Sequence, residues 1–135
     1  MLYDIPLQRW IGRWKGQRLP PAGFFDGQTV LITGGTAGMG LAAAVHYASL
    51  GADVIITGRT QSRGEKAKQH IEEAAAKRNG KGKVDFMSLD MSRYASCTLF
   101  VDELKKRYQG RGGLDVVVLN AGSINSHFEK SPEGW

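Results

Sequence analysis

Short apolar runs alternate along the chain with longer segments of helical periodicity, and glycine-rich turns separate them. The runs with the length and β-branched content of strands are residues 29–33, 53–57, 83–89 and 114–119. The segments with helical spacing are residues 38–50, 62–78 and 97–108. This alternation predicts a parallel sheet in the strand order 3-2-1-4, with right-handed crossovers and helices on both faces.

Local signals predict where these elements end and how deeply they lie. Gly51 is expected to close the first helix in a left-handed conformation. Ser62 and Glu65 have the spacing of a capping box, which predicts that the second helix begins at Ser62. The unbroken apolar run at 114–119 predicts a strand that is buried on both faces.

The fold class predicted from this order is α/β, a doubly wound, Rossmann-like parallel sheet that runs only to its fourth strand. Residues 26–135 would form a partial NADP-binding domain, and residues 1–25 an extension in front of it. Leu7, Trp10 and Trp14 have helical spacing in this extension. The extension could lie on a membrane surface or pack on the domain or a partner, and we expect packing.

Composition narrows the classes of function. The 135 residues carry a formal net charge of +5, but the basic residues are scattered, so no nucleic-acid partner is expected. Neither a membrane-spanning run nor a signal peptide is evident, which predicts a cytoplasmic protein. Cys97 is the sole cysteine and is expected to be a buried, unreactive thiol. The three histidines lack metal-ligand spacing, so no metal site is expected.

The turn after the first strand carries the chemistry of anion binding. Residues 33–40 read TGGTAGMG. Gly34 lies where the strand must turn sharply, and Gly38 and Gly40 lie where the helix begins. Side chains at the latter two positions would keep a pyrophosphate away from the free amides and positive end of the helix. A glycine turn between a strand and a helix therefore predicts a dinucleotide site.

The end of the second strand indicates which dinucleotide. NAD-binding folds place an acidic residue there for the ribose hydroxyls, whereas this chain has Gly58 followed by Arg59. A guanidinium can hold a 2′-phosphate that a carboxylate would repel. NADP(H) is the predicted cofactor, and Thr36 or Arg63 could contact the same phosphate.

The spacing T-G-x-x-x-G-x-G at residues 33–40 resembles the short-chain dehydrogenase/reductase family, and the resemblance extends over about residues 27–135. It implies that Asp90, in Asp90-Met91-Ser92, contacts the adenine, although Asp90 could equally cap a helix. It further implies that Asn120, Ala121 and Gly122 let the cofactor ribose approach the sheet. Met39 would flank the phosphate on the nicotinamide side.

The resemblance implies hydride transfer between a nicotinamide and a small ketone, aldehyde or alcohol. The family's catalytic tyrosine and lysine come as Tyr-x-x-x-Lys, and no tyrosine of this chain has a lysine four residues further on. No catalytic residue is therefore assigned, and the chain is expected to stop before the catalytic Ser, Tyr and Lys. A non-catalytic NADP-binding or regulatory protein and an inactive truncated relic are the alternatives. Oligomerisation stays open, and a bare fourth strand predicts poor solubility of the isolated chain.

Overall fold

The computed structural model describes residues 20–110, 112–123, 126–128 and 130–134. The helix predicted around Trp10 lies outside these residues. The elements, in chain order, are β1 (Thr29–Ile32), α2 (Gly38–Ser49), β2 (Asp53–Gly58), α3 (Gln61–Ala76), β3 (Val84–Ser88), α4 (Tyr94–Tyr108) and β4 (Val116–Val118).

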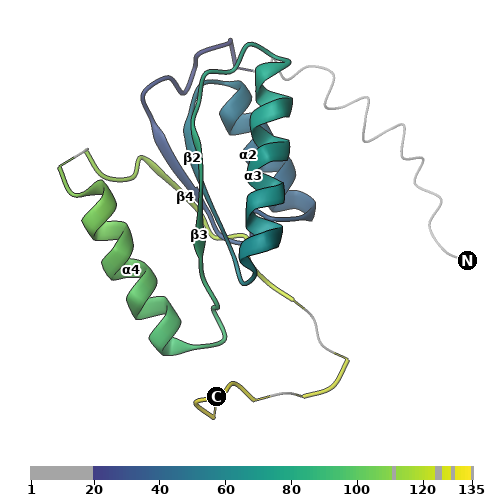
Figure 1. Ribbon diagram of the computed structural model, residues 1–135, viewed down its shortest axis with the longest axis vertical. Helices are drawn as coiled ribbons and strands as arrows, with labels where there is room; N and C mark the ends of the chain where they lie inside the picture. The colour runs from purple at the N-terminus through teal and green to yellow at the C-terminus, as the bar shows by residue number, and fades with distance from the viewer. Residues whose placement is uncertain (1–19, 111, 124–125, 129, 135) are drawn as a thin grey trace, which may run out of the picture.

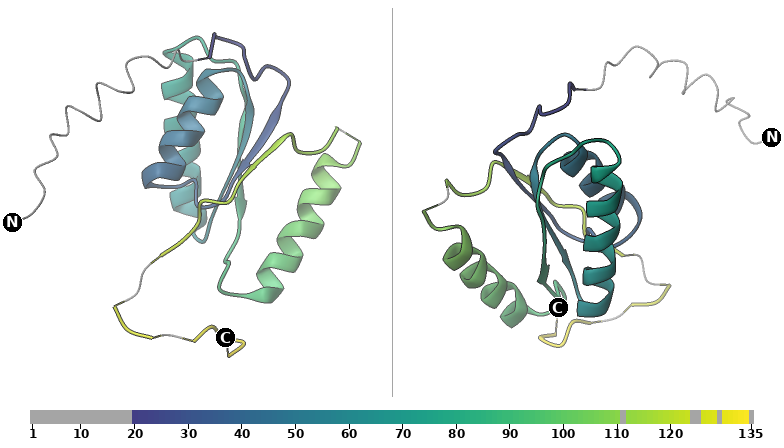
Figure 2. Two further views of the ribbon diagram at one scale, coloured as in Figure 1. Left: turned by 180° about the vertical axis from the view of Figure 1, so that it is seen from behind. Right: turned by 45° about the horizontal axis from the view of Figure 1, so that its top comes forward.

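The strands form one parallel sheet in the order β3-β2-β1-β4, which confirms the predicted fold class and topology. Helices α2 and α3 cover one face of the sheet, and α4 covers the other (Figures 1 and 2). All the strands run in the same direction, so their carboxyl ends meet at one edge of the sheet. This edge is where ligands bind in folds of this type.

Alternation along the strands divides the core into two clusters. Val30, Ile32 and Ile56 face α2 and α3, where small side chains such as Ala44 and Ala67 let the helices approach closely. On the opposite face, the cluster is Leu31, Ile55, Met87, Leu89 and Phe100. Since side chains of a strand alternate between faces, β1, β2 and β3 each contribute to both clusters.

Strand β4 differs from its prediction. It was expected to be buried on both faces, but Val117 is 50% exposed and Val116 and Val118 are half-buried. Within the described residues, β4 pairs only with β1 and lies at the edge of the sheet. An apolar run reports the potential for burial, whereas actual burial depends on the neighbours that cover the strand.

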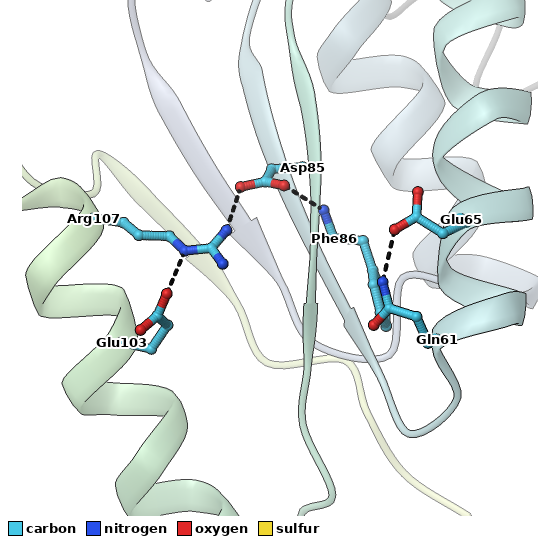
Figure 3. A network of polar contacts seen from close by, with 6 residues as sticks. All are labelled: Gln61, Glu65, Asp85, Phe86, Glu103 and Arg107. Atoms are coloured by element: carbon cyan, nitrogen blue, oxygen red, sulfur yellow. Dashed lines mark hydrogen bonds and ion pairs between the residues drawn. The ribbon is translucent and has the colours of Figure 1, made fainter.

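The helix ends agree with the sequence in one place and differ in another. Gly51 has φ +100°, and its N–H donates to the Ala48 carbonyl (3.1 Å), which confirms the predicted left-handed end of α2. The capping box is wrong, because α3 begins at Gln61 after Thr60, which makes no side-chain cap. Glu65 instead accepts from Gln61 Nε2 (2.7 Å), one helical turn earlier (Figure 3).

The segment before β1 is packed against the end of α2. Phe25 contacts Tyr47 edge-to-face, with ring centroids 4.9 Å apart. Its N–H donates to the Leu50 carbonyl (3.0 Å). The packed part of the chain therefore includes Phe25, which the sequence had placed in the extension.

A short chain of charges joins α4 to the outer strand β3 (Figure 3). Arg107 donates from NH1 to Asp85 Oδ2 (3.1 Å) and from Nε to Glu103 Oε1 (2.7 Å). The hydrogen bond that Arg107 donates to Glu103, partly offset by burial, leaves the pKa of Arg107 above its ordinary value, with Asp85 adding to the rise. Asp85 faces α4 and the adjacent Phe86 faces α3, so this part of β3 contacts both layers of helices.

Replacing Arg107 with glutamine is expected to lower the free energy of unfolding by about 0.5–1 kcal/mol. The loss is small because the Arg107 and Asp85 side chains are 45% and 40% exposed, and water screens such pairs. Urea unfolding would measure the change. The matched control is Lys106→Gln, which removes a neighbouring exposed charge and should shift stability by less than about 0.5 kcal/mol. Equal losses in both variants would contradict a specific tie between α4 and β3.

Candidate functional site at the carboxyl edge of the sheet

The residues singled out from the sequence lie in the loops that follow the four strands. Gly34 and Thr36 follow β1, Arg59 follows β2, Asp90 follows β3, and the Asn120 loop follows β4. These segments meet at the carboxyl edge because the strands are parallel. The structure thus places residues from well-separated parts of the sequence along one edge.

The turn between β1 and α2 depends on the conformation of glycine. Gly34 has φ +68° and Gly38 has φ +55°, values that residues with a Cβ adopt at a cost. Gly34 donates its N–H to Thr57 Oγ1 (3.3 Å), and Gly35 donates to the Thr57 carbonyl (3.1 Å). The turn is therefore fixed to the end of β2 by both groups of Thr57.

Gly38 and Gly40 lack a side chain for different reasons. A Cβ on Gly38 would meet nothing within 4 Å, so that position faces open space. A Cβ on Gly40 would lie 2.5 Å from both Asn120 Nδ2 and the Gly34 carbonyl oxygen. Gly40 therefore has a structural reason to lack a side chain, the close approach of α2 to the ends of β1 and β4.

The first turn of α2 has the properties of an anion site. Its N-cap is Ala37, which makes no side-chain cap, and no acidic residue lies in the turn. The first N–H groups of a helix have no partner within the helix, and the helix dipole adds positive potential there. Met39 lies in this turn and is 83% exposed.

A hydrogen-bond network centred on Thr33 joins the ends of β1 and β4. Thr33 is buried, and its Oγ1 accepts from the N–H groups of Asn120 (3.0 Å) and Ala121 (3.1 Å). Asn120 Nδ2 donates in return to the carbonyls of Thr33 (3.1 Å) and Gly34 (3.3 Å). The amide of Asn120 thus bonds backbone groups that directly follow the neighbouring strand β1.

Ala121 and Gly122 lie beside the glycine turn and are exposed. A Cβ on Gly34 would approach the Ala121 Cα to 3.0 Å, so these two loops are in contact. A Cβ on Gly122 would meet only the Asn120 carbonyl, at 4.0 Å. Because Ala121 and Gly122 are small, little side-chain volume projects from the chain at these two positions after β4.

Two threonine hydroxyls are part of this arrangement and were not identified from the sequence. Thr33 and Thr57 are each the last or nearly the last residue of an apolar run, where threonine is read as an ordinary strand residue. Their burial, at 4% and 1% exposure, is the signal that matters, because buried hydroxyls need partners. That signal is visible only once the strands are paired.

The end of β2 places Gly58 beside Thr36. A Cβ on Gly58 would lie 2.7 Å from Thr36 Cγ2, so the two residues are in close contact. Arg59 follows with an exposed side chain. This point of the edge therefore combines a missing side chain on the strand with an exposed cation next to it.

Asp90 accepts hydrogen bonds from Ser92 and lies close to positive charge. Its Oδ1 accepts from the Ser92 hydroxyl (2.7 Å) and the Ser92 N–H (3.1 Å). These bonds, followed by the charges of Arg59 and Arg93, hold the pKa of Asp90 below its ordinary value. Asp90 caps the turn that precedes α4, not the helix itself, whose N-cap is Arg93; the helix-capping alternative is therefore wrong in that form.

The described residues form neither a metal site nor a membrane span. In the described part of the chain, no group of three or more His, Cys, Asp or Glu could hold a metal ion. No helix among the described residues is both long and apolar enough to cross a membrane. Cys97 is half-buried and packs at the border of the cluster around Phe100.

A parallel sheet in this strand order, with a glycine turn between its first strand and the following helix, defines a Rossmann-type nucleotide-binding protein. The family profile described as short chain dehydrogenase matches residues 28–133. The chain belongs to the short-chain dehydrogenase/reductase family of oxidoreductases, whose members bind nicotinamide cofactors.

Relatives in several organisms share this similarity. The chain is 38% identical over 126 residues to the short-chain dehydrogenase/reductase ffsI of Aspergillus flavipes, covering 90% of this chain and 36% of that protein. It is 38% identical over 122 residues to the polyprenol dehydrogenase of Danio rerio, covering 90% and 35%. The chain thus spans about a third of the length of these relatives.

Solved structures show the same fold. A metagenomic short-chain oxidoreductase in complex with NADP superposes with a TM-score of 0.60 at 28% identity, over 73% of this chain and 41% of that one.

Proposed function

We propose that the chain binds NADP(H) at the carboxyl edge of its sheet, as the cofactor-binding part of an oxidoreductase that interconverts a carbonyl and an alcohol. Its substrate class is a small ketone, aldehyde or alcohol. Because the chain spans about a third of the relatives it matches, the reaction is proposed for the whole protein. When bound, the nicotinamide supplies or accepts the hydride.

The residues present fit the pyrophosphate of a dinucleotide. The space beside Gly38 is open, and the adjoining first turn of α2 has neither a side-chain cap nor an acidic residue. Gly34 and Gly38 would place no side chain between the turn and the pyrophosphate, and the amides around Met39 would donate to the phosphate oxygens. Gly40 and Asn120 would act indirectly, by holding α2 against the ends of the strands.

The adenosine end of the site is assigned to the loops after β2 and β3. Asp90, as a carboxylate, would accept from the exocyclic amine of adenine. Arg59 would bind the 2′-phosphate through paired charge-assisted hydrogen bonds. Ala121 and Gly122 would allow the nicotinamide ribose to lie against the end of β4.

The observation that carries the choice of NADP(H) is the end of β2. At the position where an acid would bind the ribose hydroxyls of NAD(H), the chain has Gly58, and an exposed arginine follows it. The solved relative in complex with NADP is consistent with this choice.

Titration of the chain with NADPH and NADH tests the proposal. The chain is expected to bind NADPH more tightly, and Arg59→Asp should weaken NADPH binding by about 10- to 100-fold, because a hydrogen-bonded charge contributes about 1.5–3 kcal/mol. NADH binding should change far less. The matched control is Arg78→Asp, which alters an exposed arginine after α3, at the opposite end of the molecule.

Equal affinity for the two nucleotides in the unmodified chain would contradict the proposal. So would an equal loss of NADPH binding in the Arg59 and Arg78 variants, since that result would reflect overall charge. A non-catalytic NADP-binding protein is the alternative, and it predicts the same affinities but no consumption of NADPH when carbonyl compounds are added to the whole protein.

A further inference from the structure

We infer that Thr36 determines cofactor selectivity by occupying the space that an acidic side chain at the end of β2 would need. The inference rests on the proposed function and adds a residue to it. In this view Gly58 and Thr36 act as a pair, because the threonine side chain fills the space that the glycine leaves. An acidic side chain at position 58 would therefore clash with Thr36.

The contact between the two residues is close. A Cβ on Gly58 would lie 2.7 Å from Thr36 Cγ2 and 3.3 Å from Thr36 Oγ1. The first distance is shorter than carbon atoms tolerate, so any side chain at position 58 requires Thr36 to move. The methyl group, being nearer than the hydroxyl, is the main obstacle.

Thr36 has little freedom to move away. It lies in the glycine turn, which is held to the end of β2 by the bonds from Gly34 to the Thr57 hydroxyl and from Gly35 to the Thr57 carbonyl. Thr57 directly precedes Gly58, so the turn and the strand end move as one unit. A β-branched side chain also has few rotamers available.

Phe86 also borders the space beside Gly58. The same Cβ would lie 3.6 Å from Phe86 Cε2, and Phe86 is buried. Its ring is held in turn by α3, because a Cβ on Gly64 would collide with it. Figure 3 shows Phe86 directed toward the α3 side of β3. A side chain at position 58 is thus confined between Thr36 and a fixed aromatic ring.

This arrangement predicts that an acid introduced alone will not convert the site. Gly58→Asp should reduce NADPH binding by at least about tenfold through charge repulsion, without strengthening NADH binding. Adding Thr36→Ser removes the methyl group and should strengthen NADH binding by about tenfold relative to Gly58→Asp. Adding Thr36→Val keeps the branched shape without the hydroxyl, and NADH binding should stay as in Gly58→Asp.

Equilibrium dialysis with both nucleotides, on the chain and its variants fused to a soluble carrier, would measure these affinities. The unliganded chain gives a second readout: Gly58→Ala should lower the urea midpoint in the Thr36 and Thr36→Val backgrounds and much less in the Thr36→Ser background. The Thr36→Ser variant thus tests the effect of the methyl group, and the Thr36→Val variant tests the effect of the hydroxyl.

The outcomes separate this inference from the proposed function. If the unmodified chain does not prefer NADPH, the proposed function fails, and the selectivity assigned to Thr36 fails with it. If the chain prefers NADPH but Gly58→Asp alone gains NADH binding, Thr36 is not an obstacle. If the valine variant rescues NADH binding as well as the serine variant does, the branched shape of Thr36 is not the obstacle, and the inference fails.

Discussion

Replacing Gly40 with alanine is expected to lower the free energy of unfolding by about 2–3 kcal/mol, the upper part of the range for overpacking. Helix propensity alone would give the opposite sign, since alanine is favoured over glycine inside a helix by roughly 0.5–1 kcal/mol. The added methyl group would lie 2.5 Å from Asn120 Nδ2 and from the Gly34 carbonyl oxygen. Both groups are held in the network between β1 and β4, so α2 must shift.

Urea unfolding of the variant would measure this loss, and Ala42→Gly supplies the control. Ala42 is exposed on the same helix, so its replacement isolates the propensity term, a loss of roughly 0.5–1 kcal/mol. We also expect Gly40→Ala to weaken dinucleotide binding, because the first turn of α2 would be displaced. A variant as stable as the unmodified chain would show that α2 does not depend on this close approach.

Replacing Thr33 with valine is expected to cost about 1–2 kcal/mol in stability. Valine has nearly the same shape, but it removes the acceptor of two part-buried hydrogen bonds from backbone N–H groups, and leaving such a donor unsatisfied costs about 1–3 kcal/mol. Asn120 N–H keeps a second acceptor, the Val118 carbonyl (3.1 Å), whereas Ala121 N–H loses its hydrogen bond to the Thr33 hydroxyl. The effect should therefore concentrate at the end of β4.

Hydrogen exchange would locate that effect. The amide of Ala121 should exchange faster in Thr33→Val, while amides in α3 should change only with global stability. Thr33→Ser is the matched control, because it keeps the hydroxyl and removes one methyl group. If serine and valine variants exchange alike at Ala121, the hydroxyl is not what holds the loop.

The fold was largely accessible from the sequence, because the signals for it are local. Apolar runs bounded by glycine marked the strands, and Gly51 marked the end of α2 through a conformation that other residues avoid. The helix start predicted at Ser62 was wrong. A capping box requires the helix to begin at one given residue, and the loop after Gly58 is short enough for α3 to begin at Gln61. The predicted burial of Val117 was wrong, because an edge strand and a central strand can have the same composition.

Only some residues of the candidate site could be predicted from the sequence. Gly34, Asn120 and Asp90 stand out by residue type and by position after a strand. Thr33 and Thr57 do not, because their roles depend on the partners that strand pairing brings to their hydroxyls. The pairing of Thr36 with Gly58 is likewise a contact across two loops, and no spacing in the sequence reports it.

The strand order has a kinetic consequence. Pairing of β1 with β4 joins residues far apart in the chain, as in the bond from Thr29 N–H to Asp115 Oδ2, which spans 86 positions. Closing so long a loop is entropically slower than joining β1 to β2. Asn120 reaches Thr33 only after that closure, so the proposed nucleotide site at the carboxyl edge should form last. Refolding monitored by nucleotide binding should therefore lag behind refolding monitored by helix content.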